Sequence, residues 1–320
     1  MVDRPALSRA FFLLAQVFDK GFTPDVRSRL EEAGNPIPSL IGVSRSREDE
    51  VSRHERVLGY AVLPYAGVFL NIDARIGGET ESALVRAIQD AGLPLKHDGL
   101  APEHVASEAR LLSQLVQASS CDGITSQLIS DHLLSWLPSF AHALRENDAA
   151  DYADGADLLV ELCLTILDAV PTDSVQVVLA PAVVPTEDPR SGIRQISEHL
   201  AAHARSGIYL GRSGIGQIAR QAEAPRGFGG SVLMLGNLFR SAAHFESLPA
   251  VTGSLVEIAA SYRAMWQDCA SRHQAFEAWS QAWITRIDAT VSMLSEVCEA
   301  IDFDSDEASD SGGGIASEGI

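Results

Sequence analysis

The sequence predicts an all-α protein, and three observations lead to this class. Apolar residues recur at intervals of three and four along most of the chain, which places them on one face of a helix. The run 68–70 has strand-forming residues, but no partner strand is evident nearby and a lone strand is unstable. We therefore expect it to be extended or to lead into a helix. The apolar run 175–184 lies among four prolines between 171 and 189 and is expected to be a linker.

The first half of the chain contains six expected helices. Four are predicted over 7–19, 23–33, 44–58 and 80–91, and a central pair follows from 102 and from about 125 to 144. Pro102 suits the first turn of a helix, because its missing N–H costs nothing there. Pro138 is expected to kink or restart the second helix of the central pair. The short loop 119–123 would make these two helices antiparallel neighbours.

The second half is also predicted to be helical. Helices are expected over 151–169, 193–204, 213–221 and 231–243, and two long amphipathic helices follow with stripes over 251–266 and 276–298. We divide the chain into a helical domain, 1–170, a proline-rich linker with a short helix, 171–205, a C-terminal helical segment, 206–301, and an acidic tail, 302–320. The tail has too little apolar content to fold and is expected to be disordered.

Composition and charge narrow the class of protein. The formal net charge of −19 disfavours binding to nucleic acid and favours a basic partner segment. No stretch of roughly 18 apolar residues is present, so no transmembrane helix is expected. The apolar run 10–17 contains Gln16 and precedes Asp19-Lys20, which indicates a folded helix and not a signal peptide. The four cysteines are far apart and form no C-x-x-C motif, so we expect no metal site and a cytoplasmic location.

Polar residues lie beside the apolar stripes of the central pair. His104 and Glu108 are four residues apart, as are His132 and Trp136, so each pair shares a helix face. One interpretation is that these residues only fix two packed helices against each other. The other interpretation is a binding site on those helices.

The central pair resembles the signature of the TorD/DmsD-type chaperones, which mature molybdoenzymes of the dimethyl sulfoxide reductase family. The residues that carry the resemblance are Pro102-Glu103-His104-Val105 with Glu108, then His132-Leu133, Trp136 and Phe140. Glu103 stands where the family usually has aspartate, which keeps the charge and lengthens its reach. The resemblance covers about residues 5–170, and the segment beyond 206 is similar to the extension of longer TorD-like members.

The resemblance implies a TorD-like helical bundle with an additional helical C-terminal segment, and a cytoplasmic chaperone that is not an enzyme and needs no cofactor. Its partner would be the apo catalytic subunit of a molybdopterin-containing oxidoreductase, with or without a twin-arginine signal peptide. The expected partner-binding residues are Glu103, His104, Glu108, Leu112, His132, Trp136 and Phe140. Leu112, Trp136 and Phe140 would form or support an apolar groove. Glu103 and Glu108 would meet basic residues, so their charge reversal is expected to weaken client binding without affecting folding. The family suggests monomers or swapped homodimers.

Four other interpretations remain open from the sequence. His104 and Glu108 could be an acid–base pair in a helical enzyme. The region 210–242 could be a helix-turn-helix of a DNA-binding regulator. His199 and His203 have a spacing that can bind metal, although solvated helix histidines are favoured. Gly211–Gly216 is glycine-rich before a helix but lacks the lysine of a phosphate-binding loop.

Overall fold

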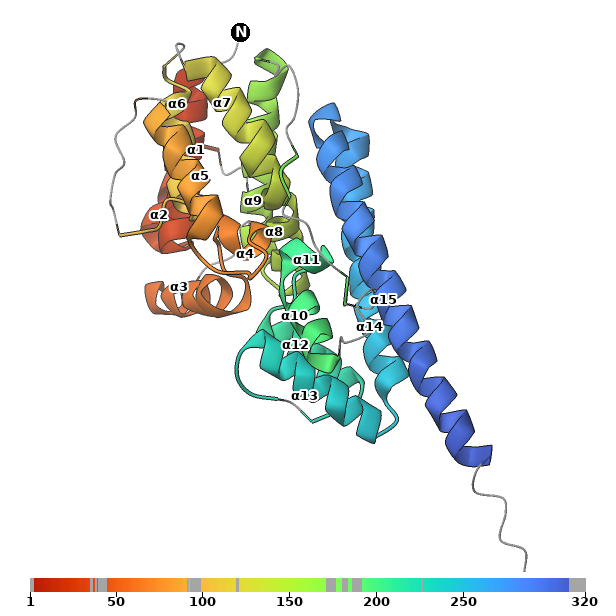
Figure 1. Cartoon of the computed structure of the whole chain (residues 1–320). Coiled ribbons are helices and arrows are strands. Elements are labelled where there is room, and N and C mark those ends of the chain that lie inside the picture. The colour runs from red at the N-terminus through yellow and green to blue at the C-terminus, as the bar shows by residue number, and fades with distance from the viewer. Residues whose placement is uncertain are drawn as a thin grey trace, which may run out of the picture.

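The protein folds into helices, as a computed structural model shows (Figure 1). The structure describes residues 3–34, 37, 39, 45–90, 92, 99–118, 121–170, 177–179, 184–185, 192–225 and 227–310, with side chains up to 298. Within these residues the only β-type pairing is an isolated bridge between Tyr65 and His104. The predicted all-α class is therefore confirmed. Among the same residues, none of the helices has the length and apolar content needed to cross a membrane.

The first half consists of a helical bundle followed by short connecting helices. Its elements are α1 Arg4–Lys20, α2 Pro24–Glu32, α3 Arg47–His54, η2 Glu55–Ala61, α4 Ala66–Leu70, α5 Gly78–Asp90, α6 Val105–Leu115, α7 Asp122–Leu128, η4 Ile129–Leu133, α8 Leu134–Glu146 and α9 Ala150–Ala169. Helix α1 packs against α6 and α9, and α8 packs along α9. The run 68–70 belongs to the short helix α4 and is not extended.

Two predicted helix boundaries are wrong for local reasons. Helix α6 begins at Val105 and not at Pro102, because His104 is extended and its ring nitrogen Nδ1 accepts the N–H of Ala106 at 3.0 Å. The expected helix over 125–144 changes from the π-helix η4 to the α-helix α8 at Leu134, four residues before Pro138. A proline ring clashes with the carbonyl four residues earlier, so the expected restart occurs at that position. Helix α8 then continues through Pro138.

The second half contains a group of shorter helices and a long hairpin. The shorter helices are α10 Ile193–Ala201, α11 His203–Ser206, α12 Arg212–Gln221 and α13 Ser231–His244, and the hairpin is α14 Leu248–Arg272, η6 Gln274–Phe276 and α15 Glu277–Asp310. Figure 1 shows the hairpin in blue along one side of the molecule. Because α15 continues to Asp310, the expected disorder of 302–310 is wrong, and 311–320 lie outside the described residues. Most of the expected linker 171–192 also lies outside them.

Aromatic side chains join the hairpin to the first half. The indole N–H groups of Trp279 and Trp283 donate to the backbone carbonyls of Ser130 at 2.7 Å and Ser135 at 2.9 Å. Phe69 of α4 stacks on Tyr209, which precedes α12, with ring centroids 5.2 Å apart. The apolar core is thus continuous across the expected domain boundary. The boundaries themselves stay predictions.

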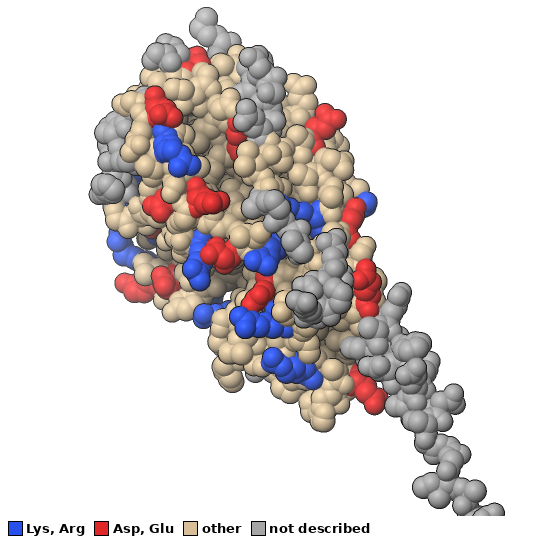
Figure 2. Space-filling view, viewed as in Figure 1, with Lys and Arg blue, Asp and Glu red and all other residues tan. Residues whose placement is uncertain are grey.

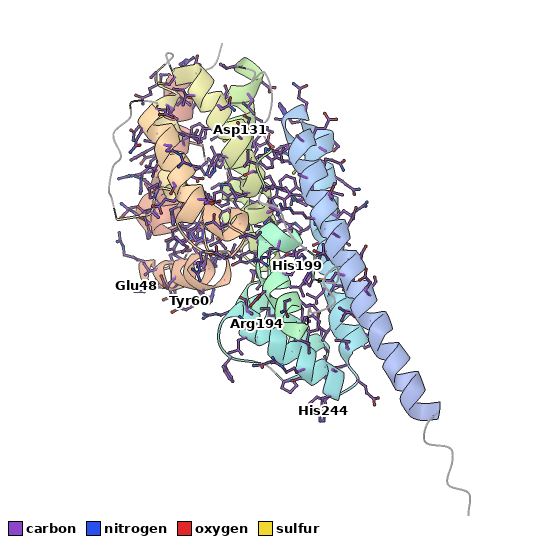
Figure 3. All side chains as sticks on the ribbon, in the orientation of Figure 1. Glu48, Tyr60, Asp131, Arg194, His199 and His244 are labelled. Atoms are coloured by element: carbon purple, nitrogen blue, oxygen red, sulfur yellow. The ribbon has the colours of Figure 1, made fainter. Side chains whose placement is uncertain are left out.

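The histidines expected to be solvated are buried. His199 points into the interior where α10 faces α15 (Figure 3), and its Nε2 lies 2.9 Å from Thr290 Oγ1. His203 is also buried, and its Nδ1 donates to the carbonyl of Phe69 at 3.0 Å. The expected single helix breaks at Ala202, so the two residues lie on different helices. Within the described part of the chain, no three metal-binding side chains gather at one point.

Candidate binding cleft

The predicted site residues lie mostly inside the protein. Those that are buried are Glu103, His104, Glu108, Leu112, Trp136 and Phe140. Of the predicted residues only His132 is partly exposed, with 15% of its side chain accessible. The expectation that Glu103 and Glu108 face a basic client is therefore corrected, because neither carboxylate reaches the surface in this structure. The apolar members of the set form core contacts, such as the ring pair Trp136–Phe140 at 5.5 Å.

Glu103 organises the loop that follows α4. Its carboxylate accepts the backbone N–H of Gly67 at 2.9 Å and that of Gly77. Burial raises the pKa of Glu103 to about 7, and the two backbone donors oppose that rise. A Cβ on Gly67 would lie 2.6 Å from the carbonyl oxygen of Arg75, so only glycine permits this close approach. Glu103 is therefore a positioning residue beneath the loop.

The loop between α4 and α5 is fixed on several sides. The Asn71 amide donates to the carbonyls of Arg75 and Gly77, both at 2.7 Å, and accepts the hydroxyl of Thr80 at 2.6 Å. From the second half of the chain, Arg205 Nε donates to the carbonyl of Ile72 at 2.7 Å. These bonds connect the loop with α5 and α11. The loop is thus a firm rim for the space beside it.

Glu108 and His132 form a pair that the sequence did not predict. His132 Nε2 lies 2.7 Å from Glu108 Oε1, and burial raises the pKa of Glu108 while His132 lowers it. His104 does not pair with Glu108: it caps α6, and its ring meets Tyr65 edge-on at 4.8 Å. The expected acid–base pair of His104 and Glu108 is therefore not formed. His132 belongs to the π-helix η4, a type of turn that often occurs at functional sites.

Replacing His132 with leucine is expected to lower the free energy of unfolding by about 3 kcal/mol, because it leaves Glu108 buried without its partner. The double variant Glu108→Leu/His132→Leu should lose less than the sum of the two single variants. Urea unfolding of all four proteins measures this coupling, with Gln127→Ala on the exposed side of α7 as the control. Additive losses would show that the contact is energetically empty.

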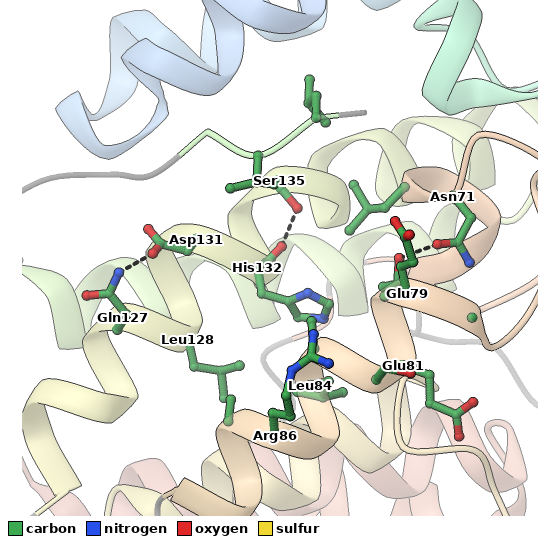
Figure 4. A pocket seen from close by; sticks show the side chains of 18 of the residues that line it. Asn71, Glu79, Glu81, Leu84, Arg86, Gln127, Leu128, Asp131, His132 and Ser135 are labelled. Atoms are coloured by element: carbon green, nitrogen blue, oxygen red, sulfur yellow. Dashed lines mark hydrogen bonds between the residues drawn. The ribbon is translucent and has the colours of Figure 1, made fainter. Parts of the chain in front are cut away.

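A cleft of about 1670 Å³ lies between α5 on one side and α7, η4 and α8 on the other (Figure 4). His132 lines this cleft, and it is the only one of the predicted site residues that does so. The cleft therefore reaches the Glu108–His132 pair from the outside. Its apolar lining includes Leu70, Ile76, Leu84, Ile124, Leu128 and Trp279.

Carboxylates outnumber basic groups along the cleft. The lining contains Asp73, Glu79, Glu81, Asp90 and Asp131, against Arg75 and Arg86. Arg75 is already 3.3 Å from Asp73, which leaves a surplus of negative charge at the rim. Figure 2 shows acidic side chains spread over the half of this face formed by the N-terminal helices, while basic side chains are more frequent over α10–α13. The cleft is larger than most small-molecule sites, which measure about 300–1,000 Å³.

The sequence offered one signal for this cleft. Glu79 and Glu81 stand in the first turn of α5, directly after the Gly77-Gly78 turn, and such a group of charges at a helix start is visible without a structure. Their neighbour across the cleft, Asp131, lies some fifty positions further along the chain. Only the packing of α5 beside η4 brings them to one space.

Comparisons with known proteins do not assign the chain to a family. Neither the protein-family models nor the curated proteins gave a match to this sequence. The candidate site consequently rests on its geometry: an apolar cleft, a rim with surplus carboxylates and a buried Glu–His pair at its wall.

Proposed function

We propose that the protein is a chaperone for the maturation of a molybdopterin-containing oxidoreductase, and that it holds a segment of the apo catalytic subunit in the cleft. The observation that carries this proposal is the apolar cleft of about 1670 Å³ with its acidic rim. The kind of client is inferred from the resemblance of the motif around Glu103, His104 and Trp136. Within this proposal the chaperone acts in the cytoplasm, as a monomer or homodimer, and binds neither cofactor nor nucleic acid.

The chemistry of the cleft suits a segment with a basic start and an apolar continuation, such as a twin-arginine signal peptide. Leu84, Leu128 and Trp279 provide apolar surface, whose burial contributes about 25 cal/mol per Å². Glu79, Glu81 and Asp131 attract the basic residues, but exposed ion pairs contribute only about 0–1 kcal/mol each. We therefore expect apolar contacts to supply most of the affinity and the carboxylates to select the orientation.

Binding of a labelled peptide tests the proposal directly. The probe has two adjacent arginines followed by an apolar stretch of about 15 residues, and fluorescence anisotropy measures its affinity. The variant Glu79→Gln/Glu81→Gln/Asp131→Asn is expected to bind about tenfold more weakly, which corresponds to about 1.4 kcal/mol. Its melting temperature should stay near that of the wild type, because these side chains line an open cleft.

A matched control removes the same kind of charge elsewhere. Glu31 and Glu32 are exposed at the end of α2 and do not line the cleft, so Glu31→Gln/Glu32→Gln should bind the peptide as the wild type does. Equal affinities for the wild type, the cleft variant and the control would remove the cleft from the proposal. The identity of the client is tested by co-purification: a molybdopterin oxidoreductase subunit should be retained by the wild type and depleted with the cleft variant.

A further inference from the structure

Part of the cleft lining comes from the chain between α9 and α10. Val178 and Leu179 belong to this connection and both line the cleft, opposite the residues of α5. Val177–Leu179 are not helical, and Figure 4 shows a stretch of chain outside any helix that crosses above Ser135. The side chain of Leu179 is partly buried against the apolar core, whereas Val178 is 80% exposed.

A second contact holds the same connection further along. Val184 is partly buried against the core, and Pro185 is buried. The sequence from 174 to 185, SVQVVLAPAVVP, contains no charged residue and is rich in β-branched side chains. Such a composition favours extended chain over helix.

We infer that this connection, through Leu179, is an internal occupant of the cleft, and that a client binds in its place as an extended aliphatic segment. The inference rests on the proposed function of the cleft and names the conformation and class of segment that the cleft accepts. It follows from the position of Leu179, which already supplies an aliphatic side chain to the space where the client would lie.

The two occupants differ in charge, and this difference gives the exchange a direction. A segment tethered within the same chain has an effective concentration in the millimolar range, so an untethered segment must bind with better contacts to displace it. The internal segment has no basic residue and leaves Glu79, Glu81 and Asp131 without a cationic partner from it. A client that adds arginine to an aliphatic stretch gains these contacts. An uncharged aliphatic segment does not gain them and is excluded by competition.

The first test removes the internal side chain. Leu179→Ser should bind the arginine-containing apolar peptide about five- to tenfold more tightly, because one competitor contact is lost. Val178→Ser is the matched control, since the neighbouring side chain is 80% exposed and should leave the affinity unchanged. Weaker binding by Leu179→Ser would show that Leu179 is part of the wall that the client needs, and would overturn the inference.

The second test supplies the internal segment as a separate molecule. A labelled peptide of residues 174–185 should bind a full-length variant whose positions 175–184 are replaced by glycine and serine, and should not bind the wild type. The same peptide with Leu179→Asp should fail to bind. Circular dichroism and thermal melting check that the variant keeps its helices, and the Leu179→Ser experiment decides the matter if it does not.

The outcomes separate the two proposals. If the arginine-containing peptide binds and the 174–185 peptide does not, the internal occupant is ruled out and the chaperone proposal stands. If only the 174–185 peptide binds, the cleft has an internal occupant and the proposed client class is wrong. Failure of both peptides would remove both.

Discussion

Reversing the charge of both Glu103 and Glu108 with lysine is expected to unfold the protein. Both carboxylates are buried, with 0% and 1% of their surfaces accessible. At position 103 an ammonium group would face the N–H donors of Gly67 and Gly77, and at position 108 it would face His132. Each uncompensated buried charge costs several kcal/mol, and a whole domain has only about 5–15 kcal/mol of stability. Circular dichroism should show the loss of helix.

The control is the same change of charge on the surface. Glu31→Lys/Glu32→Lys alters two exposed residues of α2 and should melt within a few degrees of the wild type. A folded Glu103→Lys/Glu108→Lys protein with normal melting would mean that these carboxylates reach solvent. It would then restore the groove-facing role that the sequence suggested for them.

Acid is expected to destabilise the protein through two buried histidines. Burial lowers the pKa of His203 to about 3 and that of His142 to about 4, from an ordinary value of 6.5. Below their ordinary pKa these histidines take up protons only on unfolding, so the unfolded state binds more protons and stability falls with pH. Glu103 acts in the opposite direction, because its raised pKa of about 7 favours the folded state as it becomes protonated. The net loss between about pH 6.5 and 4.5 should be about 3 kcal/mol.

Urea unfolding at three pH values in this range measures the effect. His203→Gln removes one of the two titrating rings and should make the free energy of unfolding less dependent on pH, although the loss of the bond to the Phe69 carbonyl lowers it at all pH values. A free energy of unfolding that rises toward acid would show that Glu103 outweighs both histidines.

Helices with long apolar stripes were predictable from the sequence, and their irregular ends were not. The expected helices over 80–91 and 151–169 agree with α5 and α9 within two residues at each end, because their stripes continue to the ends. The start of α6 depends on the ring of His104 acting as a cap, which spacing does not reveal. Nor does spacing reveal η2 and η4, since a π-turn adds a residue without changing which residues are apolar.

The site was harder to predict than the fold, because it depends on contacts between distant segments. Trp136 and Phe140 were placed correctly on an apolar face, but the same pattern fits a groove wall and a core. Glu103 is covered by the loop after α4, and Glu108 meets a residue of the next helical segment. A carboxylate beside an apolar stripe is therefore ambiguous until the segment that covers it is known.

The four tryptophans of the chain give its intrinsic fluorescence an unusual spatial focus. Trp266, Trp279 and Trp283 belong to the α14–α15 hairpin, Trp136 belongs to α8, and all four indoles are buried. Two of them donate directly to carbonyls of the first half. Detachment of the hairpin would expose these indoles to water even if every helix remained intact. A red shift in emission without loss of ellipticity would therefore report separation of the hairpin specifically, whereas unfolding would change both signals together.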